Sequence, residues 1–279
     1  MKVCVFGAGT MGAGIAQVMA AAGNPVILCD IDLEHSRRGK QQIADNLARQ
    51  VNKGKMDAHR AENLLQRITA TDDMILAAHC ELVIEAIKEE MNAKTTLLSK
   101  LHLICDQETL FASNTSSLSI TEMSAKSGRP IVGMHFFNPV PVMELVEVIA
   151  GLNTPAQSID QVVAIVKGIG KIPIIVQDSS GFVVNRLLIP MINEAVFILA
   201  EGVASAKDID EAMKLGANYP IGPLSLADLI GNDIVLAIME TLLRDTGDQK
   251  YRPAPLLRKM VLGGLLGKKS GRGFFNYKF

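Results

Sequence analysis

Short apolar runs alternate with helical stretches through the first part of the chain. Residues 2–6 and 25–29 are apolar and β-branched, and residues 13–22 between them have a helical pattern that ends at a glycine. A helix is predicted at 93–102, and further strands are predicted at 82–84, 109–112, 131–136, 142–149 and 172–176. Strands that alternate with helices predict an α/β domain with a parallel sheet.

One polar stretch interrupts this alternation. Residues 35–67 carry many Lys and Arg residues and have a helical pattern, with no strand between them. They predict an inserted pair of helices, a helical hairpin, that turns near Lys53 and Gly54.

The pattern changes after residue 181. No segment beyond this point is typical of a strand, and Ser205 and Asp208 form a capping box before one of the helices. Helices are predicted at 182–201, 208–215, 224–243 and 255–263. The sequence therefore predicts two domains, 1–183 and 184–279, of which the second is all-α.

Residues 182–200 are the best candidate for a membrane-spanning helix. The stretch is interrupted by Asn185, Arg186, Pro190, Asn193 and Glu194. These residues are costly in lipid, so we expect a buried helix and no membrane association.

Composition adds an expectation about assembly. Hydrophobic residues make up 48% of the 279 residues and charged residues 20%, with a mean hydropathy of +0.24. An exposed surface carries less apolar area than this, so we expect large cores and a buried subunit interface. A net charge of −1 gives no overall field that would attract nucleic acid or an anionic membrane.

The four cysteines lie among apolar residues and form no C-x-x-C pair. They predict buried thiols in a reducing cytosol and no metal site. The segment before Gly7 is too short for the apolar region of a signal peptide, so we expect a cytoplasmic protein.

A glycine motif predicts a dinucleotide site. Gly7, Gly9 and Gly12 match G-x-G-x-x-G between a predicted strand and helix, and Asp30 ends the next strand. In this context the glycines allow a tight turn, close approach of a pyrophosphate and close helix packing. Asp30 would bind the adenosine ribose hydroxyls and repel a 2′-phosphate, which favours NAD over NADP. The predicted cofactor contacts here are Gly7, Gly9, Thr10, Met11, Gly12 and Asp30. The alternative is an ordinary turn without a ligand.

His135 lies at the end of the predicted strand 131–136. Ligands of open α/β sheets bind at the carboxyl ends of the strands. Imidazole, with an unperturbed pKa near ~6.5, can take the hydroxyl proton when an alcohol is oxidised. Glu147 lies among β-branched residues and needs a partner when buried, for which His135 is suited. By spacing alone, a His and a Glu twelve residues apart are more often a coincidence than a catalytic pair.

Two further polar groups are candidates for the site. Residues 113–117, Ser-Asn-Thr-Ser-Ser, follow a predicted strand. Their hydroxyls and amide could bind a substrate oxygen or the nicotinamide ribose, or cap the next helix, or do both. Asn185 lies in an otherwise apolar helix and needs a partner, in the core or on a ligand.

With these residues assembled, the chain resembles the 3-hydroxyacyl-CoA dehydrogenase family, and within it the bacterial 3-hydroxybutyryl-CoA dehydrogenases. The resemblance covers essentially the whole chain. It rests on GAGTMGAGIAQ, ASNTSSLSIT, GMHFFNPVPVM, GFVVNRLLIPMINEA, residues 213–228 and GKKSGRGFFNY. It implies a Rossmann-type dinucleotide-binding domain with a helical hairpin insertion, followed by an all-α domain that forms a homodimer.

The resemblance also implies an activity: NAD-dependent oxidation of an (S)-3-hydroxyacyl-CoA, such as 3-hydroxybutyryl-CoA, and the reverse reduction of acetoacetyl-CoA. It implies that His135 is the general acid/base and that Glu147 orients it. It further implies that Ser116 and Asn185 contact the substrate, and that Asn138 completes the site.

Binding residues follow from the same resemblance. Lys53, at the tip of the insertion, is implied to bind the coenzyme A arm, where an ammonium would neutralise phosphate. The implied cofactor contacts are Asp30, Glu89, Lys94, Ser116, Asn138 and Lys269.

The chain departs from the family pattern at several positions. Glu144 replaces the usual lysine, and strand alternation should point it away from Glu147. Ser180 replaces a proline, which should loosen the connection between the domains. Asn46, Glu90 and Tyr219 also replace usual residues.

Two alternatives to a thioester dehydrogenase are considered. A related β-hydroxyacid dehydrogenase would act on a free acid and use a lysine base, where this chain has Asn185 and Arg186. A non-enzymatic, crystallin-like dinucleotide-binding protein would have no need of both His135 and Glu147.

Overall fold

The computed structural model describes residues 1–277 and divides into two compact units. Unit 1 is Met1–Ser179, and unit 2 begins at Ser180. Residue 183, near which the sequence predicted the division, immediately precedes helix α7 (Val184–Ala200). Each unit has its own hydrophobic core.

Unit 1 is built on one sheet of eight strands in the order β3-β2-β1-β4-β5-β6-β7-β8. The strands are β1 (Val3–Phe6), β2 (Val26–Cys29), β3 (Ile68–Thr71), β4 (Leu82–Glu85), β5 (Leu110–Ser113), β6 (Val132–Phe136), β7 (Leu145–Ala150) and β8 (Ile172–Gln177). β1, β2 and β4 are buried along their whole length, as expected of central parallel strands. The α/β prediction is confirmed.

One strand pair differs from the prediction of a parallel sheet. β6 and β7 pair antiparallel, while all other neighbours are parallel. Fewer than ten residues connect β6 to β7, and parallel pairing would require a longer crossover connection. The prediction of a parallel sheet was wrong for this pair, because the connection between β6 and β7 is too short for a crossover.

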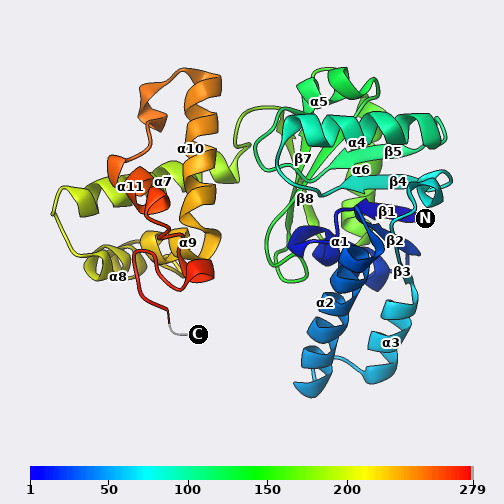
Figure 1. Ribbon diagram of the computed structural model, residues 1–279, viewed down its shortest axis with the longest axis horizontal. Helices are drawn as coiled ribbons and strands as arrows, with labels where there is room; N and C mark the ends of the chain where they lie inside the picture. Colours follow the sequence, from blue (N-terminus) through cyan, green and yellow to red (C-terminus); the bar gives the residue numbers. More distant parts are fainter. Residues whose placement is uncertain (278–279) are drawn as a thin grey trace. The chain divides into compact units, whose positions relative to one another are not determined.

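The helices of unit 1 cover the sheet (Figure 1). They are α1 (Thr10–Ala21), α2 (Leu33–Asn52), α3 (Ala58–Gln66), α4 (Met91–Ile104), α5 (Ile120–Ser127), α6 (Ala156–Gly168) and the short 3₁₀ helix η1 (Met74–Ala77). Figure 1 shows α2 and α3 projecting from the sheet as a hairpin, which confirms the predicted insertion.

Several elements of unit 1 were missed or misplaced by the sequence interpretation. β3, α5 and α6 were not predicted; β3 is a short edge strand with two threonines, and α5 contains two serines and a lysine. The strand predicted at 142–149 begins only at Leu145. The preceding residues form a turn, in which the amides of Val142 and Met143 both donate to the carbonyl of Pro139 (2.9 and 3.0 Å).

Unit 2 is helical, and its described residues contain no strand, as predicted. Its helices are α7, α8 (Ala206–Ala217), α9 (Pro223–Ile230), α10 (Asn232–Thr246), α11 (Pro255–Leu262) and the 3₁₀ turns η2 (Gln249–Tyr251) and η3 (Lys268–Ser270). The single helix predicted at 224–243 was wrong, because Gly231 at φ 109° separates α9 from α10. The predicted cap is confirmed: the Ser205 hydroxyl accepts from the Asp208 amide at 3.2 Å.

Within residues 1–277, no helix is both long enough and apolar enough to span a membrane.

Candidate active site

The glycine turn after β1 has two crowded glycines and one open glycine. A Cβ on Gly7, which has φ 96°, would lie 2.5 Å from the carbonyl oxygen of Ala86. A Cβ on Gly12 would lie 1.7 Å from the carbonyl oxygen of Gly7. A Cβ on Gly9 would meet no atom within 4 Å, so the backbone there borders open space. This is the arrangement that a pyrophosphate requires above the N-terminus of α1, which no side chain caps.

Asp30 follows β2 and supports this turn. One carboxylate oxygen accepts from the Ala8 amide at 2.6 Å, and the other accepts from the Ile31 amide at 2.7 Å. The carboxylate is therefore fixed beside the turn with its negative charge in place. A ribose hydroxyl could donate to a remaining lone pair, whereas a 2′-phosphate would be repelled.

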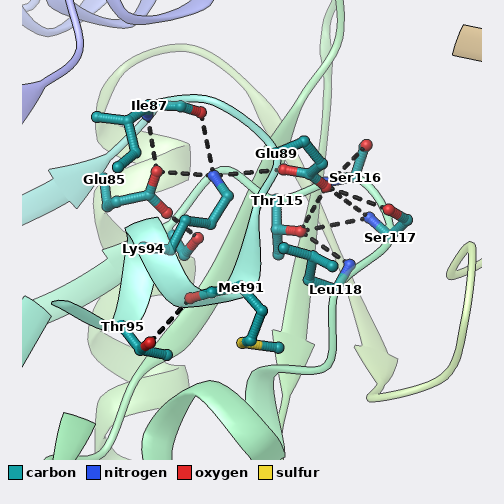
Figure 2. A network of polar contacts seen from close by, with 11 residues as sticks. Glu85, Ile87, Glu89, Met91, Lys94, Thr95, Thr115, Ser116, Ser117 and Leu118 are labelled. Atoms are coloured by element: carbon teal, nitrogen blue, oxygen red, sulfur yellow. Dashed lines mark hydrogen bonds and ion pairs between the residues drawn. The ribbon is translucent and has the colours of Figure 1, made fainter. Parts of the chain in front are cut away.

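A chain of buried charges lies behind the carboxyl ends of β4 and β5 (Figure 2). The ammonium of Lys94, on α4, contacts Glu85 Oε1 at 2.7 Å, the carbonyl of Ile87 at 3.2 Å and Glu89 Oε2 at 3.3 Å. The side chains of Glu85 and Lys94 are 0% and 1% exposed, and that of Glu89 is 36% exposed. Burial raises the pKa of Glu85, against the opposing effects of Lys94 and of its hydrogen-bond donors.

Glu89 links this chain of charges to the loop after β5. Its Oε1 accepts from the Thr115 hydroxyl at 2.7 Å, from the Ser116 amide at 2.8 Å and from the Ser117 amide at 3.1 Å. Burial disfavours the ionised carboxylate, but Lys94 and the Thr115 and Ser116 donors outweigh burial and lower the pKa of Glu89. The loop that carries Ser116 is therefore held by an ionised carboxylate.

His135 and Glu147 face each other across the antiparallel pair β6–β7. The register places them directly opposite, and His135 Nδ1 lies 2.7 Å from Glu147 Oε2. The two residues are 5% and 1% exposed. A buried carboxylate bonded to Nδ1 fixes the orientation and tautomer of the ring. The contact that the sequence suggested is present.

The loop after β6 carries Asn138, which is exposed on the surface of unit 1. The loop is held at two points. The amide of Phe136 donates to Asn114 Oδ1 at 2.9 Å, and the Lys171 ammonium donates to the carbonyls of Val140 and Met143 at 2.7 and 2.6 Å. Burial lowers the pKa of Lys171, whereas the nearby Glu144 opposes this effect.

Glu144 itself is exposed and precedes β7, so it takes no part in the contact between His135 and Glu147. Among the other departures from the family pattern, the Ser180 hydroxyl donates to Asp245 at 2.7 Å. Asn46 accepts from Arg49 at 2.8 Å, and Glu90 pairs with Lys88 at 2.7 Å.

The remaining predicted residues lie elsewhere on the two units. Lys53 caps the C-terminus of α2 at the exposed tip of the hairpin. In unit 2, Asn185 lies in the first turn of α7, and the Lys269 ammonium pairs with Asp233 at 2.6 Å. Arg186, the residue after Asn185, donates to the Tyr251 hydroxyl at 3.2 Å.

Sequence reasoning missed two supporting residues, Glu85 and Lys171. Glu85 had a signal, since a carboxylate at the end of a fully apolar strand needs a partner as much as Glu147 does. Lys171 gave none, because its partners are main-chain carbonyls distant in sequence. The Asn114 amide, predicted to bind a ligand or cap a helix, accepts from the Phe136 amide. Within residues 1–277, no group of three or more His, Cys, Asp or Glu side chains could hold a metal ion.

Protein-family models match both units. The NAD binding domain of 3-hydroxyacyl-CoA dehydrogenase matches residues 2–179, and the C-terminal domain of the same enzyme matches residues 181–277. The chain belongs to the 3-hydroxyacyl-CoA dehydrogenase family. It is therefore an oxidoreductase with NAD as its cofactor, in agreement with the open glycine turn and Asp30.

Individual members of the 3-hydroxyacyl-CoA dehydrogenase family are similar over the full length. A probable 3-hydroxybutyryl-CoA dehydrogenase of Bacillus subtilis is 50% identical over 279 residues, covering 99% of this chain and 97% of the relative. The 3-hydroxybutyryl-CoA dehydrogenase of Clostridioides difficile is 49% identical, with 99% of both chains covered. The crystal structure of (S)-3-hydroxybutyryl-CoA dehydrogenase from Ralstonia eutropha superposes with a TM-score of 0.96 at 47% identity, covering 100% of this chain and 99% of that one.

Proposed function

We propose that the protein interconverts (S)-3-hydroxybutyryl-CoA and acetoacetyl-CoA with NAD, and that His135 is its general acid/base. The observation that carries the proposal is the buried contact between His135 and Glu147 at the end of β6, on the sheet that also carries the glycine turn. A pure binding protein has no use for a carboxylate-oriented imidazole there. The relatives that share the whole chain support the choice of substrate.

In the oxidation, the chain moves one proton. Glu147 holds Nδ1 of His135 and stabilises the positive charge that the ring acquires, while Nε2 takes the proton of the 3-hydroxyl. When bound, NAD would supply the acceptor for the hydride from carbon 3, the carbon that bears this hydroxyl. In the reverse direction His135 returns the proton to the 3-oxygen of the ketone.

We assign the remaining residues to binding. In unit 1, Ser116 and Asn138 bind the 3-oxygen and the thioester, and Lys53 neutralises a phosphate of the coenzyme A arm. In unit 2, Asn185 is assigned to the substrate. NAD lies along the glycine turn, residues Gly7 to Gly12, with the ribose on Asp30. In unit 1, Glu89, Ser116 and Asn138 are assigned to the nicotinamide side, and Lys94 contacts Glu89. In unit 2, Lys269 is assigned to the cofactor.

A spectrophotometric assay tests this assignment. Purified protein is given NADH and acetoacetyl-CoA, and the loss of NADH absorbance is followed; acetoacetate as the free acid is the matched control. Turnover with the thioester alone is the expected result. The thioester assignment would be contradicted by a folded protein that binds NADH but reduces only the free acid or neither compound. Replacing NADH by NADPH should lower the rate, because Asp30 repels the 2′-phosphate.

We also infer a cytoplasmic homodimer formed through unit 2. Unit 2 exposes several large apolar side chains, which a subunit interface would cover. They include Leu187, Val203, Leu215, Leu229 and Leu262. The four reduced, buried cysteines suit a reducing compartment. Light scattering on the full chain should give the mass of two chains, and a monomer would contradict the inference.

A further inference from the structure

The charges behind the glycine turn do not balance. Glu85 and Glu89 bring two carboxylates to the single ammonium of Lys94, and Glu85 and Lys94 are almost completely buried. Buried ion pairs are a weak source of stability, since apolar side chains of similar volume usually stabilise a fold at least as well. A buried carboxylate that exceeds the available positive charge therefore needs a further reason.

The contacts of Glu85 hold Lys94 in one position. Its Oε1 accepts from Lys94 at 2.7 Å and from the Ile87 amide at 2.7 Å, and its Oε2 accepts from the Ser113 hydroxyl at 2.5 Å. The carbonyl of Ile87 takes another proton of the same ammonium at 3.2 Å. Little freedom is left for the Lys94 side chain, and its ammonium does not reach the surface.

The remaining direction of Lys94 points to Glu89, as Figure 2 shows. Glu89 Oε2 lies 3.3 Å from the ammonium, and its Oε1 faces the donors of Thr115, Ser116 and Ser117. One carboxylate thus meets Lys94 with one oxygen and the loop with the other. A change in the position of Lys94 would move the oxygen on which the loop depends.

We propose that Glu85 is a positioning residue for the cofactor side of the site, which acts through Lys94 and Glu89 on the loop of residues 115–117. The inference rests on the proposed function in one respect, the placing of Glu89 and Ser116 beside the nicotinamide. In this arrangement Lys94 acts on the cofactor side through its contact with Glu89.

The pKa directions agree with this division of roles. The buried end, Glu85, has a raised pKa, whereas that of Glu89 is lowered by Lys94 and the loop donors despite burial.

The first test is Glu85→Gln, which keeps the shape and an acceptor oxygen but removes the charge. NADH affinity is measured by the fluorescence of the bound nucleotide, without acyl-CoA, well below the melting temperature. We expect the dissociation constant to rise about tenfold, within the range of coupling seen between residues of one network. The KM for NADH should rise with it, while kcat changes less, because His135 and Glu147 are untouched.

The second test distinguishes positioning from a merely structural effect. If Glu85 acts through Glu89, the effect of Glu85→Gln on NADH affinity should vanish in a Glu89→Gln background. Asp210→Asn is the control: Asp210 is also a buried carboxylate, and it accepts from the Leu224 and Ser225 amides in unit 2. It should lower the melting temperature and leave the NADH dissociation constant unchanged.

Two results would overturn the inference: an unchanged NADH dissociation constant in Glu85→Gln, or an equal loss with and without Glu89. If Glu85→Gln does not fold, Ser113→Ala removes only the hydroxyl that holds Glu85 Oε2, and the same dependence on Glu89 must appear. NADH binding is measured without a thioester. A wild-type protein that binds NADH but does not reduce acetoacetyl-CoA would therefore contradict the proposed substrate and leave this test intact.

Discussion

At the scale of single residues, His135 and Glu147 are both buried, and each needs the other for a different reason. The carboxylate is almost fully buried, so without the ring it would be a desolvated charge with a large penalty. In the proposed mechanism the ring becomes positively charged during the oxidation, and a fixed carboxylate 2.7 Å away would stabilise that charge. Substitutions at the two positions therefore have different expected effects.

His135→Ala removes the group that accepts the proton. We expect turnover to fall by about 10²- to 10⁴-fold, the usual contribution of a positioned general base. NADH affinity should stay near that of the wild type, because the glycine turn and Asp30 are elsewhere on the sheet edge. Steady-state kinetics with acetoacetyl-CoA and fluorescence of bound NADH measure the two quantities. A parallel loss of both would identify His135 as a structural residue.

Glu147→Gln keeps an oxygen that can accept from Nδ1 but removes the charge that stabilises the imidazolium. We expect a smaller loss of turnover than for His135→Ala, with an unchanged NADH dissociation constant. The double variant should be no slower than His135→Ala alone, since Glu147 acts only through the ring. An unchanged rate in Glu147→Gln would remove this residue from the mechanism.

Sequence reasoning reached this pair for a physical reason. Each member of the pair is anomalous by itself, as a histidine at a strand end and a carboxylate in a β-branched strand. The contact required the antiparallel register of β6 and β7, which pairs residues distant in sequence, and local patterns do not encode that register. Lys171 could not be found in this way, because its partners are the main-chain carbonyls of Val140 and Met143, and local sequence patterns do not show which side chain meets a carbonyl distant in sequence.

At the scale of elements, the end of β1 and the start of α1 pack closely against each other. Their closeness depends on Gly12, where a side chain would collide with the Gly7 carbonyl. Gly9, two residues after Gly7, borders open space instead. The sequence motif predicted the close packing at Gly12 correctly, because it follows from the geometry of a strand that turns directly into a helix. The approach of a pyrophosphate to Gly9 stays a prediction.

These two glycines make a matched pair of variants. Gly12→Ala should lower stability by about 1–3 kcal/mol, the usual range for overpacking, because the added methyl group displaces α1 from the turn. Gly9→Ala should leave the melting temperature near that of the wild type, since its φ of −70° suits alanine and nothing is within 4 Å. It should nevertheless raise the NADH dissociation constant by on the order of tenfold, because the methyl group occupies the space of the pyrophosphate. Thermal melts measure the stability of both variants, and NADH titrations measure their dissociation constants. Equal effects of the two variants on NADH binding would contradict the separate roles of Gly9 and Gly12.

Elements that lack an apolar pattern were the ones the sequence did not reveal. The edge strand β3 is only four residues long and has threonine at every second position. Because it lacks an apolar pattern, its extended conformation depends on its pairing with β2. The break at Gly231 was also missed, since α9 and α10 together have a continuous helical pattern and only the positive φ of one glycine separates them.

At the scale of the whole molecule, the core of unit 1 encloses every cysteine: Cys4, Cys29, Cys80 and Cys105. Burial raises the pKa of Cys29 to about 12 and that of Cys105 to about 11, so few of these thiols are ionised near neutral pH. We expect a thiol reagent to label none of the four in the native protein and all of them after denaturation. Cys80 differs, because its hydrogen bond with Cys4 lowers its pKa, and burial alone protects it. Rapid labelling of Cys80 in native protein would show that unit 1 opens locally.

The same burial should make unit 1 sensitive to alkali. The pKa of Cys29 is higher in the folded protein than its ordinary value of 9.0, so the folded state binds this proton more tightly than the unfolded chain. The resulting stabilisation is complete below pH 9.0 and is lost as the pH rises toward about 12. Lysines and tyrosines titrate in the same interval, and the Cys29→Ala variant separates their contribution from that of the thiol. We expect the melting temperature of the wild type to fall more steeply than that of Cys29→Ala across this interval. Equal slopes would mean that the thiol ionises in the folded core as easily as in water.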